Sequence, residues 1–262
     1  MVSRFDTVIV VDWSARSAPA PPRPVRDAIW WCVHGRPPRY ERTRQEFEDQ
    51  FTQVLFETKG RIFAGFDFAF SYPQWFLRAL RLDWRGLWAL LEREIDDGPA
   101  SNNRFAVAAS LNRRATGEAA PFWGAPVEFA FLKRHKPRSR AFGAELRDCE
   151  AALRPKPRSG FQLWGAGSVG SQTLLGIPVL ERLRRRFGDE LAVWPFEARQ
   201  ARIVLAEVYP SCLPKALWSG HPIPDREQVR HLAAAFARGV ALARAGPARG
   251  EGGIVLPASP QA

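Results

Sequence analysis

Apolar and polar positions alternate along the first quarter of the chain in a way that separates short strands from one helix. Apolar, β-branched and aromatic runs predict strands at Thr7–Asp12, Ala28–His34, Arg39–Thr43 and Arg61–Asp67, with a helical stripe before the fourth. Hairpins between the first three strands imply antiparallel pairs, and the crossover helix implies a parallel return. The pattern therefore indicates an α/β fold around a mixed sheet.

The middle of the chain is less regular, and the pattern returns after it. Mixed Asn, Gly, Pro and aromatic residues predict a helical and irregular insertion at about residues 96–160. A glycine-rich turn running into a helix follows, then two more strands and a final helix. The expected helices are Ser71–Arg81, Trp84–Ile95, Gly143–Leu153, the one after Phe161 and Asp225–Ala245, and the expected later strands lie in Leu191–Glu197 and Ala201–Pro210.

The arrangement of these elements predicts one domain over residues 1–245. The remaining segment, residues 246–262, is rich in Gly, Pro and Ala, and we expect it to be a flexible tail. The chain has no internal repeat. A length of 262 residues is enough to bury a sizeable core in one elaborated domain.

Composition excludes several classes of protein. No 18-residue apolar stretch is free of charge and the chain enters a strand almost at once, so we expect neither a membrane span nor a secretory signal, and a cytoplasmic location. The three cysteines and four histidines are widely scattered, without ligand spacing. This pattern argues against a zinc site and favours reduced thiols.

A formal net charge of +11 favours partners that carry phosphate. Arginine outnumbers lysine 33 to 5, however, which is a bias that genome base composition alone can produce. Five tryptophans, Trp13, Trp30, Trp31, Trp123 and Trp164, are candidates for stacking on bases, although most of ten tryptophans belong in a core.

Three carboxylates occupy strand-like apolar runs, where ionised groups are rare. They are Asp12 in VIVVDWS, Asp67 in RIFAGFDFAF and Glu207 in RIVLAEVYP. Burying one unpaired acid costs several kcal/mol, so three of them predict a shared proton or cation. Carboxylate oxygens suit Mg²⁺ or Mn²⁺, and two-metal sites of this kind hydrolyse phosphodiesters. The alternative is that each acid starts a turn or pairs with an arginine.

The order of strands and acids resembles the ribonuclease H-like superfamily, and several motifs resemble an uncharacterised bacterial family of predicted ribonuclease H-like nucleases. The motifs are VVDWS, GFDFAFSYP, NRF with PFWG, FQLWGAGSVGSQTLLGIP, EVYPS and DREQV. The resemblance implies a ribonuclease H-like mixed central sheet flanked by helices. It also implies a catalytic and metal-binding site of Asp12, Asp67 and Glu207, with Asp225 nearest the last helix. Asp225 followed by Gln228 is equally typical of a helix cap.

A second group of residues is a candidate for binding phosphate or substrate. Gly165, Gly167 and Gly170 fit GxGxxG before a helix, where backbone N–H groups and a helix N-terminus can hold a phosphate. A glycine turn needed for positive φ or close packing is the alternative. The other candidates are Ser14 beside Asp12, Ser168 and Gln172 of the glycine loop, and Asn103, Arg104 and Asn112, which could form a polar wall.

Three functions are consistent with these observations. The first is a nuclease that uses Mg²⁺ or Mn²⁺ to cut DNA or RNA. The second is a nucleic-acid or nucleotide-binding protein without hydrolysis, in which phosphate is bound by the glycine loop and by the basic clusters Lys133–Arg140, Arg154–Arg158 and Arg182–Arg186. The third is a small-molecule phosphotransfer or cofactor-biosynthesis enzyme on a related fold.

Overall fold

The computed structural model describes residues 2–3, 5–127, 129–137, 142–165, 168–197, 200–242 and 250–258. The chain divides into two compact units. The first unit comprises Met1–Asp67, Leu183–Ala245 and Gly253–Ala262, and the second unit comprises Phe68–Arg182 and Gly246–Gly252. The second unit is thus larger than the insertion expected at residues 96–160, because helices before and after that range pack with it.

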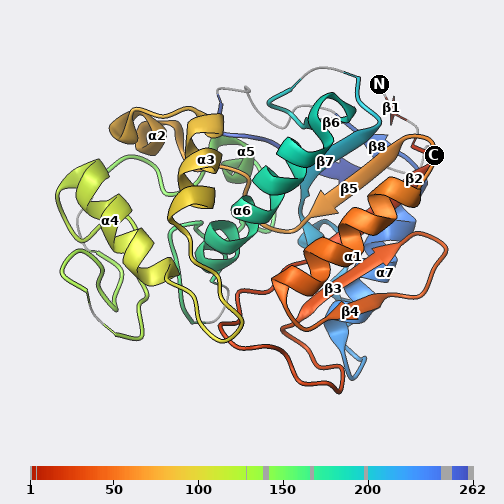
Figure 1. Ribbon diagram of the computed structural model, residues 1–262, viewed down its shortest axis with the longest axis horizontal. Helices are drawn as coiled ribbons and strands as arrows, with labels where there is room; N and C mark the ends of the chain where they lie inside the picture. Colours follow the sequence, from red (N-terminus) through yellow and green to blue (C-terminus); the bar gives the residue numbers. More distant parts are fainter. Residues whose placement is uncertain are drawn as a thin grey trace. The chain divides into compact units, whose positions relative to one another are not determined.

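The first unit is built on a sheet of nine strands in the described part of the chain (Figure 1). The strand order is β1-β8-β9-β7-β5-β2-β3-β4, and β6 pairs with β7. Strands β2, β5, β7 and β9 run parallel, whereas β3 is antiparallel to both β2 and β4. The bounds are β1 Val2–Ser3, β2 Thr7–Asp12, β3 Ile29–Val33, β4 Arg39–Glu41, β5 Ile62–Phe66, β6 Leu191–Val193, β7 Ile203–Val208, β8 Val240–Ala241 and β9 Ile254–Pro257. The predicted α/β class and mixed central sheet are confirmed.

Helices cover both faces of this sheet. Helix α1 (Arg44–Glu57) begins where the Thr43 hydroxyl accepts the Glu46 N–H, and its Phe47 and Phe51 rings pack against Phe66 of β5. Helix α7 (Pro224–Ala237) packs against the opposite face. The strands therefore have an α1 face and an α7 face.

The pairing register assigns each strand residue to one of these faces, because successive side chains alternate across a sheet. On the α7 face lie Val8 and Val10 of β2, Phe63 of β5, and Ala206 and Val208 of β7, all buried together with the apolar side of α7. Their alternate neighbours face α1. This assignment determines which carboxylates lie on the same face of the sheet and can contact one another.

The C-terminal segment differs from the expected flexible tail. Ile254–Pro257 form β9, which pairs in parallel with β7 and antiparallel with β8. Ile254 and Val255 are buried, so this short apolar run is held by the sheet although glycines precede it. Residues 243–249 and 259–262 lie outside the described residues.

The second unit is mainly helical and has an aromatic centre. Tyr72, Phe76, Phe122 and Phe161 form a buried cluster of ring contacts. The helix α4 was not expected, and the helix expected at Gly143–Leu153 is only one turn. The helices are α2 Gln74–Leu80, α3 Trp84–Glu94, α4 Arg104–Thr116, α5 Asp148–Ala151 and α6 Gly170–Phe187, and short 3-10 turns occur at Gly188–Glu190, Pro210–Cys212 and Lys215–Leu217.

Candidate metal centre

Asp12 and Asp67 come together at the carboxyl ends of two adjacent parallel strands. Asp12 is the last residue of β2, Asp67 directly follows β5, and the preceding residues Val11 and Phe66 are register partners. The two carboxyl groups share a hydrogen bond, and the Trp13 N–H donates to Oδ1 of Asp67 at 2.8 Å. Both residues are half-buried, so solvent reaches the pair.

Both carboxyl groups hold a proton more firmly than an ordinary aspartate does. Burial raises the pKa of Asp12 well above its usual 3.8, and the charge and hydrogen bond of Asp67 raise it further. Burial also raises the pKa of Asp67, to about 6, although hydrogen bonds from Asp12 and the Trp13 N–H oppose that shift. The pair therefore keeps a shared proton in its hydrogen bond.

Two further aspartates lie within electrostatic range of this pair. Asp225, in the first turn of α7, and Asp27, just before β3, both raise the pKa of Asp12. Burial raises the pKa of Asp225 itself, and the Asp27 N–H lowers it by donating to Oδ2 of Asp225 at 2.6 Å. The N-cap of α7 is Ile223, without a side-chain cap, so the helix-cap alternative for Asp225 is wrong.

Asp27 was not expected in the site. Its φ is +57°, a left-handed conformation in which non-glycine residues are uncommon. The Ser14 hydroxyl donates to the Asp27 carbonyl at 2.8 Å, and the Arg44 guanidinium donates to the Ser14 carbonyl at 3.0 Å. Ser14, expected to bind phosphate, is thus part of a tether that leads through the Asp27 backbone to Asp225. One signal was in the sequence: an antiparallel hairpin places the start of its second strand beside the end of its first.

Glu207 lies at the same end of the sheet as Asp12 and Asp67, but its side chain lies on the other face. It is the register partner of Phe66, the residue before Asp67, and Phe66 packs against α1. The alternation of side chains therefore places Glu207 on the α1 face, whereas Asp12 and Asp67 continue the α7 face. Glu207 is buried, at 4% exposure. Glu207 therefore shares the end of the sheet with Asp12 and Asp67 but not their face, and its part as a third ligand stays a prediction.

The donor set suits one divalent cation rather than a complete cluster. Among the described residues, no three His, Cys, Asp or Glu side chains converge closely enough to hold a metal ion. Two adjacent carboxyl groups that share a proton and reach solvent nevertheless offer hard oxygen donors, and Mg²⁺ commonly binds through one or two carboxylates plus water and substrate oxygens. Asp12 and Asp67 fit this requirement.

Two of the expected substrate-binding residues have structural roles in the second unit. Asn112 is fully buried, where its amide accepts the Phe122 N–H and donates to the carbonyls of Phe122 and Phe131. Asn103 accepts the Asp96 N–H and donates to the Glu94 carbonyl. Full burial removes Asn112 from the polar wall expected from the sequence, whereas Asn103 is partly exposed and its part in such a wall stays a prediction.

The glycine loop also has structural reasons for its composition. Gly165 has a φ of +95°, and a Cβ on Gly170 would lie 2.5 Å from the Gly160 carbonyl and 2.7 Å from that of Gln162. Gly167 lies outside the described residues. The turn alternative therefore accounts for Gly165 and Gly170 without a phosphate.

The polar members of the same loop are held within the second unit. The Ser168 N–H donates to the Gly165 carbonyl, and the buried Arg104 donates through Nε to the Ser171 hydroxyl at 2.9 Å. Gln172 is partly exposed in the first turn of α6. A phosphate role for these residues remains a prediction.

Comparison with known proteins identified no similar protein. The chain matches no family model, no curated protein and no solved structure. Among the described residues, no helix has the length and apolar character needed to span a bilayer. The geometry of Asp12, Asp67 and their neighbours is therefore the basis for assigning a function.

Proposed function

We propose that this chain is a ribonuclease H-like nuclease that hydrolyses phosphodiester bonds with Mg²⁺ or Mn²⁺. The observation that carries the proposal is the hydrogen-bonded pair of Asp12 and Asp67 at the ends of β2 and β5. Protein carboxylates that share a proton in this way are poised to exchange it for a cation.

The topology of the sheet supports the same proposal. Three sequential antiparallel strands, β2, β3 and β4, precede a crossover helix and a fourth strand parallel to the first. This is the strand arrangement that the resemblance to ribonuclease H-like proteins implies, with one acid on the first strand and another at the fourth. In this proposal Asp225 on α7 is the acid that the resemblance implies nearest the last helix.

The three aspartates have different roles in this proposal. Asp12 and Asp67 would hold the cation, and Asp225 would add negative charge beside it. When bound, Mg²⁺ or Mn²⁺ supplies Lewis-acid activation of water and stabilises charge on the leaving oxygen. The net charge of +11 would draw a polyanionic substrate toward the protein.

A cleavage assay tests the proposal. Purified protein is incubated with labelled single- and double-stranded DNA, RNA and an RNA–DNA hybrid, in Mn²⁺, in Mg²⁺ and in EDTA. We expect cleavage of at least one polymer in the presence of metal, and a loss of roughly 100-fold or more in Asp12→Asn. Equal cleavage by wild type and Asp12→Asn would exclude this mechanism.

A second candidate is a nucleic-acid-binding protein without hydrolysis. It is favoured by one observation, that the described side chains offer a carboxyl pair and no three-ligand cluster. Of the five tryptophans considered for stacking, Trp13, Trp30 and Trp31 are buried, whereas Trp164 is 49% exposed. Trp164 is therefore the best described platform for a base.

Binding measured without metal separates the two candidates. Anisotropy of labelled single-stranded DNA in EDTA would show salt-dependent binding that survives Asp12→Asn and weakens in Trp164→Ala. Leu217→Ala, which removes another exposed apolar side chain, is the matched control. Binding of this kind without any cleavage in Mn²⁺ favours the second candidate over the first.

A further inference from the structure

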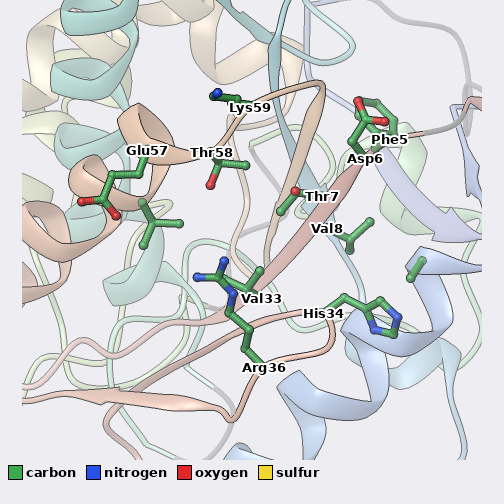
Figure 2. A pocket seen from close by; sticks show the side chains of 12 residues that line it. Phe5, Asp6, Thr7, Val8, Val33, His34, Arg36, Glu57, Thr58 and Lys59 are labelled. Atoms are coloured by element: carbon green, nitrogen blue, oxygen red, sulfur yellow. The ribbon is translucent and has the colours of Figure 1, made fainter.

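A cavity of about 470 Å³ lies at the end of the sheet where β2 begins (Figure 2). Its walls come from the start of β2, the turn after β3, the end of α1 and the end of α7. Thr7, the first residue of β2, lines it, whereas Asp12 is the last residue of that strand. At a rise of about 3.3 Å per residue the two lie roughly 16 Å apart, so the cavity is distinct from the acidic pair.

Hydrogen-bond donors face this cavity. Figure 2 shows the Arg36 guanidinium and the hydroxyls of Thr7 and Thr58 turned toward the same space, with Lys59 at its edge. Arg36 and Lys59 are exposed, and within the described residues neither head group has a hydrogen bond or an ion pair. The cavity thus presents two free cationic groups.

The carboxylates that also line the cavity are engaged by the chain itself. Oδ2 of Asp6 accepts the Arg61 N–H at 2.7 Å, and Oε1 of Glu57 accepts the side-chain amide of Gln53 at 2.8 Å. Neither forms an ion pair with Arg36 within the described residues. Both carboxylates keep their charge in these bonds, so the lining holds two acids and two bases, of which Arg36 and Lys59 have no partner within the described residues.

We propose that this cavity binds a small ligand through a phosphate group. A guanidinium presents a planar fork of N–H donors that matches phosphate oxygens, and an ammonium and hydroxyls complete such sites. The buried Val8, Val33 and Val54 supply an apolar floor. A volume of about 470 Å³ falls in the range of small-molecule sites and exceeds what inorganic phosphate fills, which favours a phosphate monoester.

Calorimetric titration in EDTA tests this site independently of any nuclease activity. The probes are adenosine monophosphate, inorganic phosphate and adenosine. We expect saturable binding of the monophosphate and none of adenosine, with affinity reduced about tenfold or more in Arg36→Gln and in Lys59→Gln. Binding of inorganic phosphate as tight as that of the monophosphate would identify free phosphate as the ligand of the same site.

The matched control is Arg78→Gln, which removes an equal charge from an exposed arginine on α2 of the second unit. It should bind the monophosphate as the wild type does, and melting curves should show that all variants fold. Three results would overturn the proposal: no binding by the wild type, unchanged binding in Arg36→Gln, or an equal loss in Arg78→Gln. The last result would assign binding to overall charge.

Discussion

Asp12 and Asp67 share a hydrogen bond across the ends of two parallel strands, so the pair retains a proton in the folded protein. Because both folded-state pKa values are raised, the unfolded chain releases protons first as the pH rises from about 3.8. The contribution of the pair to the free energy of unfolding is therefore fully present below that pH. This stability is lost as the pH rises through about 6 for Asp67 and through the raised pKa of Asp12.

Asp67→Asn should consequently stabilise the metal-free protein in alkaline but not in acidic solution. Relative to wild type we expect a gain on the order of 2 kcal/mol at about pH 8 and almost none at about pH 4. Denaturant unfolding in EDTA measures both. Asp49→Asn, which alters an exposed acid on α1, should follow the wild type, and a destabilised Asp67→Asn at alkaline pH would contradict the raised pKa.

The tether from Ser14 through Asp27 to Asp225 should affect metal use more than folding. Ser14→Ala removes a hydrogen bond worth about 1 kcal/mol. We expect it to raise the Mn²⁺ concentration needed for half-maximal cleavage, because Asp225 is no longer held in place. Asp27→Gly keeps the donating N–H and suits a φ of +57°, so it should resemble the wild type. An Asp27→Gly variant as defective as Asp225→Ala would assign the role to the Asp27 carboxylate instead.

A substitution at Glu207 tests which face of the sheet each acid occupies. Because its register partner Phe66 packs against α1, Glu207→Gln should leave Mn²⁺ affinity within about twofold of wild type, even if melting temperature changes. Paramagnetic titration of Mn²⁺ measures this directly, with Asp67→Asn as the positive control. Loss of Mn²⁺ binding in Glu207→Gln would return this acid to the site.

A substitution at Gly170 tests whether close packing or phosphate binding explains the glycine loop before α6. A methyl group there would meet two carbonyl oxygens, so Gly170→Ala should destabilise the protein by about 1–3 kcal/mol. Gly220→Ala is the matched control, since no atom lies within 4 Å of a Cβ at that position. Unchanged stability together with weaker phosphate binding in Gly170→Ala would favour the phosphate role over close packing.

The acid pair was predictable from the sequence because each aspartate stands at the end of an apolar strand. Asp12 follows four buried residues of β2, and Asp67 follows five of β5, so the strand pattern alone located both. Adjacent parallel strands place such ends together. The same reasoning gave the order of the first four strands and the helix between them.

Other parts depended on information that the sequence pattern does not carry. Glu207 ends a similar apolar run, but its face is set by the register of β7 against β5. Asn112 has the composition of a binding residue, and its burial follows from tertiary packing of α4 against the loops near Phe122 and Phe131. Ile254–Pro257 is too short to predict, and it gains its stability from pairing with β7 and β8.

The proposed function requires that Asp12 and Asp67 hold a divalent cation. The most direct measurement is anomalous diffraction from crystals of the wild type and of Asp12→Asn soaked in Mn²⁺. We expect an anomalous peak within coordination distance of both carboxylates in the wild type, about 2.0–2.2 Å from oxygen, and none in Asp12→Asn. Carboxyl groups that stay hydrogen-bonded to each other in saturating Mn²⁺, without a peak, would contradict it.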